Sequence, residues 1–72
     1  MNARLLESKM VLFGDTGGSL AEALGISRQQ FSAKKNETNG AEFTQGEIKI
    51  IKERYGLKPQ EVDDIFFASS VL

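Results

Sequence analysis

The spacing of hydrophobic and polar residues along the chain predicts five short helices. Apolar residues recur at intervals of three and four, as on one face of an α-helix, for example at Leu6, Met10 and Phe13. No strand signal of any strength is present, so the pattern predicts an all-α fold. The expected helices span residues 3–13, 17–24, 28–36, 45–55 and 59–68.

Residues that favour helix ends separate these segments. Gly25 follows the second helix, where a residue that tolerates a positive φ angle is favoured. Ser27 and Gln30 have the spacing of a capping box, which predicts the start of the third helix at the next residue. Thr44 and Glu47 repeat that spacing at the start of the fourth helix. These signals predict a helix, a three-residue turn and a second helix over residues 20–36.

Length and composition restrict the possible functions. The 72 residues are expected to form one domain, with 40% hydrophobic and 26% charged residues, as in an ordinary globular protein. There is no cysteine or histidine, which excludes disulfides and the usual zinc sites and removes the commonest general base. No apolar run approaches transmembrane length and no signal peptide is visible. We therefore expect a cytoplasmic protein of a bacterial cell, without metal, cofactor or membrane association.

Charge is unevenly distributed along the chain. The formal net charge is −1, which argues against an indiscriminate nucleic-acid binder because neutralisation of phosphates supplies most non-specific affinity. The predicted third helix is the exception, since it carries Arg28, Lys34 and Lys35 and no acid. Positive charge is thus concentrated on one short helix.

The outward face of this helix has side chains suited to reading DNA bases. With Phe31 turned toward the core, Gln29, Ala33 and Asn36 fall on the opposite side. Arg28 lies in the first turn. Arginine can bind guanine and glutamine can bind adenine through two hydrogen bonds, and an alanine methyl suits the thymine methyl. The alternative is a solvated helix on which these polar residues only maintain solubility.

The segment LAEALGISRQQFS, residues 20–32, closely resembles the helix-turn-helix of lambda-repressor-like and Cro-like phage regulators. It shares four residues of the family pattern, namely Ala21, Gly25, Ile26 and Phe31. The segment FTQGEIKIIKERYGLKPQEVDDIFFA, residues 43–68, looks like the last two helices of small phage repressors from Gram-positive hosts. This resemblance spans nearly the whole chain. It implies a five-helix lambda-repressor-like DNA-binding domain, with residues 1–72 as one domain.

The resemblance also implies a function and a set of contact residues. Proteins of this kind usually bind palindromic operators in double-stranded DNA as homodimers and act at a promoter, without a small-molecule substrate. Matching positions assign base reading to Arg28, Gln29 and Ala33. The residues expected to contact the DNA backbone are Ser27, Gln30, Ser32, Lys34, Lys35, Asn36 and Thr38.

The chain departs from the family pattern at the end of the third helix. Lys34 and Lys35 stand where many relatives have an apolar residue. We expect their stems to cover the rim of the core while their ammonium groups reach phosphate, at the cost of a frayed helix end. Glu37 stands where a glycine often closes this helix.

Two apolar residues fit poorly in a monomer. Ile50 and Phe67 lie off the buried faces predicted for the last two helices, and Val71 and Leu72 follow. Together they suggest a self-association surface. A two-fold dimer would also place two reading helices about 34 Å apart on one face of DNA.

The main alternative is a protein-interaction module on the same scaffold, such as an antirepressor that binds a partner repressor. The acidic balance of the chain and its apolar last helix favour that interpretation, whereas the first turn at Arg28 and Gln29 favours DNA. An enzyme is not expected. Asp63 and Asp64 are adjacent and therefore point to different sides of a helix.

Overall fold

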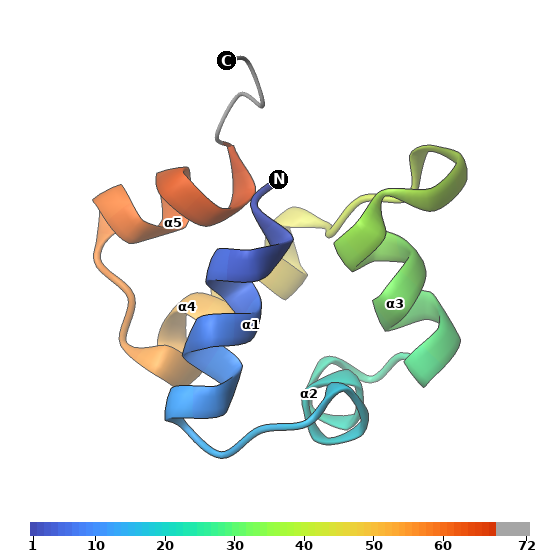
Figure 1. The fold of residues 1–72 in the computed structure, drawn as a ribbon, viewed down its shortest axis with the longest axis horizontal. Coiled ribbons are helices and arrows are strands. Elements are labelled where there is room, and N and C mark those ends of the chain that lie inside the picture. Colours follow the sequence, from blue (N-terminus) through green and yellow to red (C-terminus); the bar gives the residue numbers. More distant parts are fainter. Residues whose placement is uncertain (68–72) are drawn as a thin grey trace.

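The computed structural model describes residues 1–67, which form five α-helices and no strand (Figure 1). The helices are α1 (Ala3–Leu12), α2 (Gly17–Leu24), α3 (Arg28–Asn36), α4 (Gln45–Tyr55) and α5 (Pro59–Phe66), and a short 3-10 turn, η1 (Thr38–Gly40), follows α3. The all-α prediction is therefore confirmed for the described residues. The predicted end of the last helix is wrong, because Phe67 already has the non-helical conformation of a C-cap.

Both predicted capping boxes are formed. The Ser27 backbone N–H donates to Gln30 Oε1 at 2.9 Å, and the Gln30 N–H donates to Ser27 Oγ at 3.0 Å. Thr44 and Glu47 make the equivalent pair of bonds at the start of α4. Each box satisfies N–H groups that have no partner within the helix, which is why these helices begin where the sequence signals predict.

The core lies between the five helices, and α3 and α5 each contribute a single buried residue to it. The buried apolar residues are Leu6, Met10, Leu20, Ala21, Phe31, Phe43, Ile51, Tyr55, Leu57 and Ile65. Phe31 is the only one of these in α3. Its ring lies 5.7 Å from that of Phe43, which in turn lies 5.8 Å from the ring of Phe66 in α5. A row of aromatic rings thus joins α3 to the far side of the core, and in Figure 1 α3 and α5 lie on either side of α1.

The first helix differs from the prediction at its C-terminal end. The sequence pattern places Phe13 on the buried face, but α1 ends at Leu12 and the Phe13 side chain is 53% exposed. Because Phe13 is the C-cap, it leaves the helical face that Leu6 and Met10 share. Its ring instead packs against Tyr55, with the ring centroids 5.0 Å apart.

Asp15 fastens the α1–α2 connection to the end of α4. Its nearly buried carboxylate accepts two hydrogen bonds from the Arg54 guanidinium, at 2.7 and 2.8 Å. Tyr55 donates its phenolic O–H at 2.6 Å and Ser19 donates its hydroxyl at 2.8 Å. The Arg54 guanidinium outweighs the effect of burial and holds the pKa of Asp15 well below its usual range. Burial, together with the bond to Asp15, raises the pKa of Tyr55.

We expect Asp15→Asn to make the unfolding free energy fall less steeply as the pH is lowered below 6. An unfolded aspartate has a pKa of about 3.9. Because the folded pKa of Asp15 lies lower, the stability this carboxylate contributes is fully present above the unfolded pKa and is lost as the pH falls from there toward the folded pKa. Urea unfolding from pH 6 down to pH 2.5 should therefore give a steeper loss of unfolding free energy for the wild type than for Asp15→Asn.

Asp63→Asn is the matched control for this measurement. Asp63 is exposed on α5 and forms no salt bridge with another residue of the described range. Its variant should retain the wild-type acid slope. Equal slopes for the wild type and Asp15→Asn would contradict the role given to Asp15.

Candidate nucleic-acid interface

A three-residue turn sets α3 against α2. Gly25 ends α2 with φ +73°, a left-handed conformation that glycine adopts without strain. The N–H of Ile26 donates to the Ala21 carbonyl at 3.0 Å, which closes the turn. Ser27 then caps α3. Because Phe31 is the only fully buried residue of α3, most of this helix is left to face outward.

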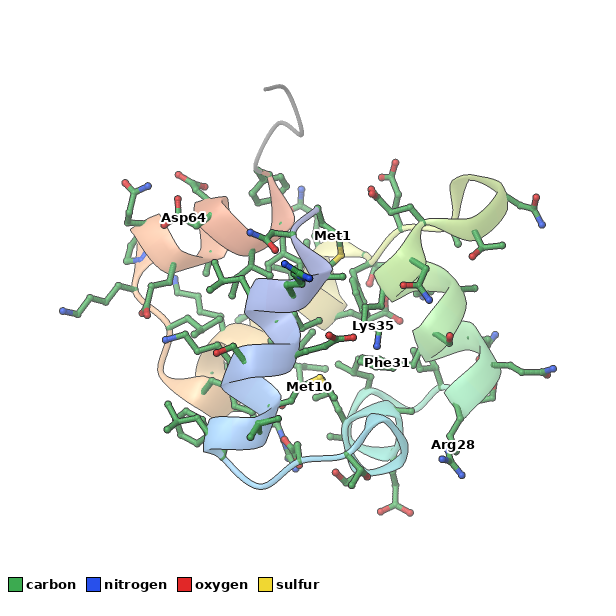
Figure 2. The ribbon with its side chains drawn as sticks, viewed as in Figure 1. Met1, Met10, Arg28, Phe31, Lys35 and Asp64 are labelled. Atoms are coloured by element: carbon green, nitrogen blue, oxygen red, sulfur yellow. The ribbon has the colours of Figure 1, made fainter. Side chains whose placement is uncertain are left out.

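Two of the three predicted base-reading residues are exposed. Arg28 and Gln29 lie at the surface in the first turn of α3, while Ala33 is half-buried. Figure 2 shows Arg28 projecting from the start of α3. Its stem runs beside the first turn of α2, since a Cβ built on Gly18 would lie 3.4 Å from Arg28 Nε. The small residue at position 18 leaves room for that approach.

The neutral residues predicted to contact the DNA backbone also lie at the surface. They are Ser27, Gln30, Ser32, Asn36 and Thr38. Ser27 and Gln30 bond to one another in the capping box, and Asn36 Nδ2 lies 3.4 Å from Ser32 Oγ. Gln30 therefore keeps its amide N–H groups free while its oxygen is used. The face is polar and hydrogen-bonding, with Arg28 as its exposed cation.

Lys34 is held inside the molecule by a carboxylate. Its Nζ donates to both carboxylate oxygens of Glu47 at 2.8 Å, and Glu47 also accepts from the Thr44 N–H. The Glu47 side chain is only 11% exposed. Burial by itself would raise the pKa of Glu47, but the bonds from Lys34 and Thr44 outweigh it and hold this pKa below its usual value.

Lys35 is also paired, in this case with α1. Its Nζ donates to Glu7 Oε2 at 2.7 Å and lies 5.8 Å from the centroid of the Phe31 ring. Figure 2 shows Lys35 directed toward α1, between the two helices. The hydrogen bond from Lys35 lowers the pKa of Glu7. In the structure both ammonium groups bind protein carboxylates, so neither is free for a phosphate.

The third helix reaches its predicted end at Asn36, and no shortening accompanies the two lysines. The helix continues to Asn36, and Glu37 closes it in a left-handed conformation with φ +55°. The Glu37 carboxylate pairs with the Met1 α-ammonium at 2.9 Å. Three ion pairs at the C-terminal end of α3 thus replace the apolar contacts that the two lysines do not make.

Sequence reasoning missed the acidic partners of these lysines. Glu47 has a local signal, but that signal indicates only a helix cap. Glu7 lies 28 residues before Lys35, and nothing in the sequence around either residue indicates the pairing. Among the described residues, Arg28 forms no salt bridge, so it remains the available cation of α3.

The predicted self-association residues are partly described. Ile50 and Phe67 are exposed, Phe67 at 60%, while Val71 and Leu72 lie outside the described residues. Sequence reasoning did not anticipate a second exposed apolar group at the end of α1. It consists of Val11, Leu12 and Phe13.

None of the helices in residues 1–67 is long and apolar enough to cross a membrane. No group of three or more acidic, cysteine or histidine side chains within that range could hold a metal ion. Comparison of the chain with protein-family models, curated proteins and solved structures finds no match.

We expect Lys34→Met to destabilise the fold by about 2 kcal/mol, because it leaves a largely buried carboxylate without its cation. Methionine keeps the length and apolar character of the stem, so the change mainly removes the ammonium group. The unfolding free energy should be measured by urea titration at pH 7.

Lys49→Met provides the comparison, since Lys49 is exposed on α4 and pairs with no acid of the described range. Its effect should stay within about 0.5 kcal/mol. If both variants lose the same stability, the Lys34–Glu47 pair does not hold α3 in place.

Proposed function

We propose that this chain is a sequence-specific DNA-binding transcriptional regulator of the lambda-repressor-like type. In this proposal α2 and α3 form the helix-turn-helix and α3 is the recognition helix. One observation carries it: α3 follows α2 after a three-residue turn, has Phe31 as its one buried residue, and exposes Arg28 and Gln29 in its first turn. The first turn of a recognition helix is the part that enters the major groove.

Within this proposal each exposed side chain of α3 has its own role in binding DNA. Arg28 would bind guanine and Gln29 would bind adenine, each through the two hydrogen bonds that its side-chain type can form. Ala33 is half-buried and contributes a small apolar contact at the edge of the face. The exposed neutral side chains that follow would donate to phosphate oxygens, which fixes the register of the protein on DNA without reading sequence. The protein would act by occupying its operator.

A homodimer on DNA is part of the same proposal. One α3 reaches few base pairs, and the net charge of −1 supplies little non-specific attraction. A two-fold dimer doubles the contacts and places two recognition helices about 34 Å apart on a palindromic operator. The exposed side chains of Ile50 and Phe67 are candidates for the contact between copies.

A second candidate function is an antirepressor that binds a partner repressor in the bacterial cytoplasm. Two observations favour it. Lys34 and Lys35 are neutralised by carboxylates of the same chain, which weakens attraction to DNA. The exposed apolar group of Val11, Leu12 and Phe13 offers a surface that a protein partner would cover.

We expect Arg28→Ala to weaken binding to the operator by about 1–3 kcal/mol and to relax the preference for one base position. Gln29→Ala should act similarly at a neighbouring base. Binding should be measured by titrating the protein into promoter-proximal DNA of its own genome at several salt concentrations.

Lys52→Ala is the control, because it removes one exposed positive charge from α4 without touching the recognition helix. It should change affinity much less than Arg28→Ala. If no specific complex forms at low salt, and the double variant of Arg28 and Gln29 changes nothing, the DNA function fails. Retention of only those duplexes that contain a symmetric site would count against the antirepressor.

A further inference from the structure

The two lysine pairs of α3 differ in how firmly the acid holds the ammonium group. Lys34 bonds to both oxygens of Glu47, whose side chain is 11% exposed and is further fixed by the Thr44 N–H. Lys35 bonds to a single oxygen of Glu7, whose side chain is 49% exposed. The first pair is part of the core boundary. In the second pair the Lys35 side chain is 19% exposed, as the Lys34 side chain is, but its acid lies at the surface, where solvent and salt reach the carboxylate.

We propose that Glu7 is an internal competitor for DNA phosphate that withholds Lys35 from the interface. This inference rests on the proposed DNA-binding function. In the free protein the Glu7 carboxylate accepts the hydrogen bond that Lys35 would otherwise donate to a phosphate oxygen of DNA. Glu7 thereby sets how much sequence-independent affinity the recognition helix has.

The strength of the pair suits such competition. Exposed ion pairs contribute little net free energy and are screened by salt. The closely spaced phosphates of a DNA duplex therefore compete with the single Glu7 carboxylate for the Lys35 ammonium group. Release of Lys35 would not leave the carboxylate isolated, because Arg4 on α1 also interacts favourably with Glu7. Lys35 also lies on the helix that carries Arg28, two turns further on, so a released ammonium remains at the C-terminal end of the proposed recognition helix.

The consequence concerns the balance between affinity and specificity. A lysine–phosphate contact strengthens binding to every sequence alike, whereas base contacts discriminate between sequences. By holding Lys35, Glu7 lowers the affinity for all DNA and leaves discrimination to Arg28 and Gln29. The chain then avoids being retained on unrelated DNA, in keeping with its low net charge.

The test is a double-mutant cycle on Glu7 and Lys35. Wild type, Glu7→Gln, Lys35→Gln and the double variant are titrated into an operator duplex and an unrelated duplex between 50 and 200 mM salt. Glu7→Gln should tighten binding to both duplexes by about three- to tenfold and steepen the slope of log affinity against log salt by up to about 0.9, the value for one added phosphate contact. The ratio of the two affinities should stay constant.

The other variants show whether a gain in DNA affinity from Glu7→Gln comes from the release of Lys35. Lys35→Gln should cost at least threefold more affinity in the Glu7→Gln background than in the wild type, since in that background no Glu7 carboxylate competes with phosphate for Lys35. Glu53→Gln makes the same change of net charge at an exposed site in the last turn of α4, and should leave the salt slope unchanged. Far-ultraviolet circular dichroism checks that every variant is folded.

Three results would overturn the inference while leaving DNA binding intact. They are a gain equally large in Glu53→Gln, a gain that persists in the double variant, or an equal loss from Lys35→Gln in both backgrounds. The proposed function fails separately: in that case the wild type and all variants bind neither duplex at 50 mM salt, and this inference falls with it.

Discussion

The structure depends on how α3 is attached, because a helix that keeps its polar side chains outward has few residues left to bury. Phe31 is the single fully buried side chain of α3, and its ring continues into the row formed by Phe43 and Phe66. Apolar contact therefore anchors one point of the helix. Charge ties the C-terminal end of the helix, firmly through the bonds of Lys34 to α4 and more weakly through the bond of Lys35 to α1.

The same use of charge extends through the described part of the molecule. Each salt bridge there joins two segments separated by at least 13 residues, including Lys9 with Glu61 between α1 and α5 and Arg54 with Asp15 near α2. In a chain of 72 residues, which buries a smaller share of its surface than a large domain does, such ties supplement a small core. The acidic residues that make the net charge negative are thus partly structural.

Local signals explain which features of the fold the sequence predicts. A capping box such as Ser27 with Gln30 is encoded within four residues, so the start of a helix can be predicted from its immediate neighbours. The partners of Lys34 and Lys35 and the role of Asp15 depend on contacts across 13 to 40 residues, which no short pattern records. Helical periodicity likewise cannot show that α1 stops one residue before Phe13. The exposure of the first turn of α3 was therefore predictable from the sequence. The neutralisation of Lys34 and Lys35 by distant carboxylates was not.

Attachment by charge has an evolutionary consequence. A helix held by core packing changes its orientation only when several core residues change together, because interiors are densely packed. A helix fixed by ion pairs such as Lys35 with Glu7 changes when one codon does, since a single base separates glutamate from lysine. The strength of α3's attachment and the charge it presents can therefore drift in small steps while Phe31 and its aromatic neighbours stay in place.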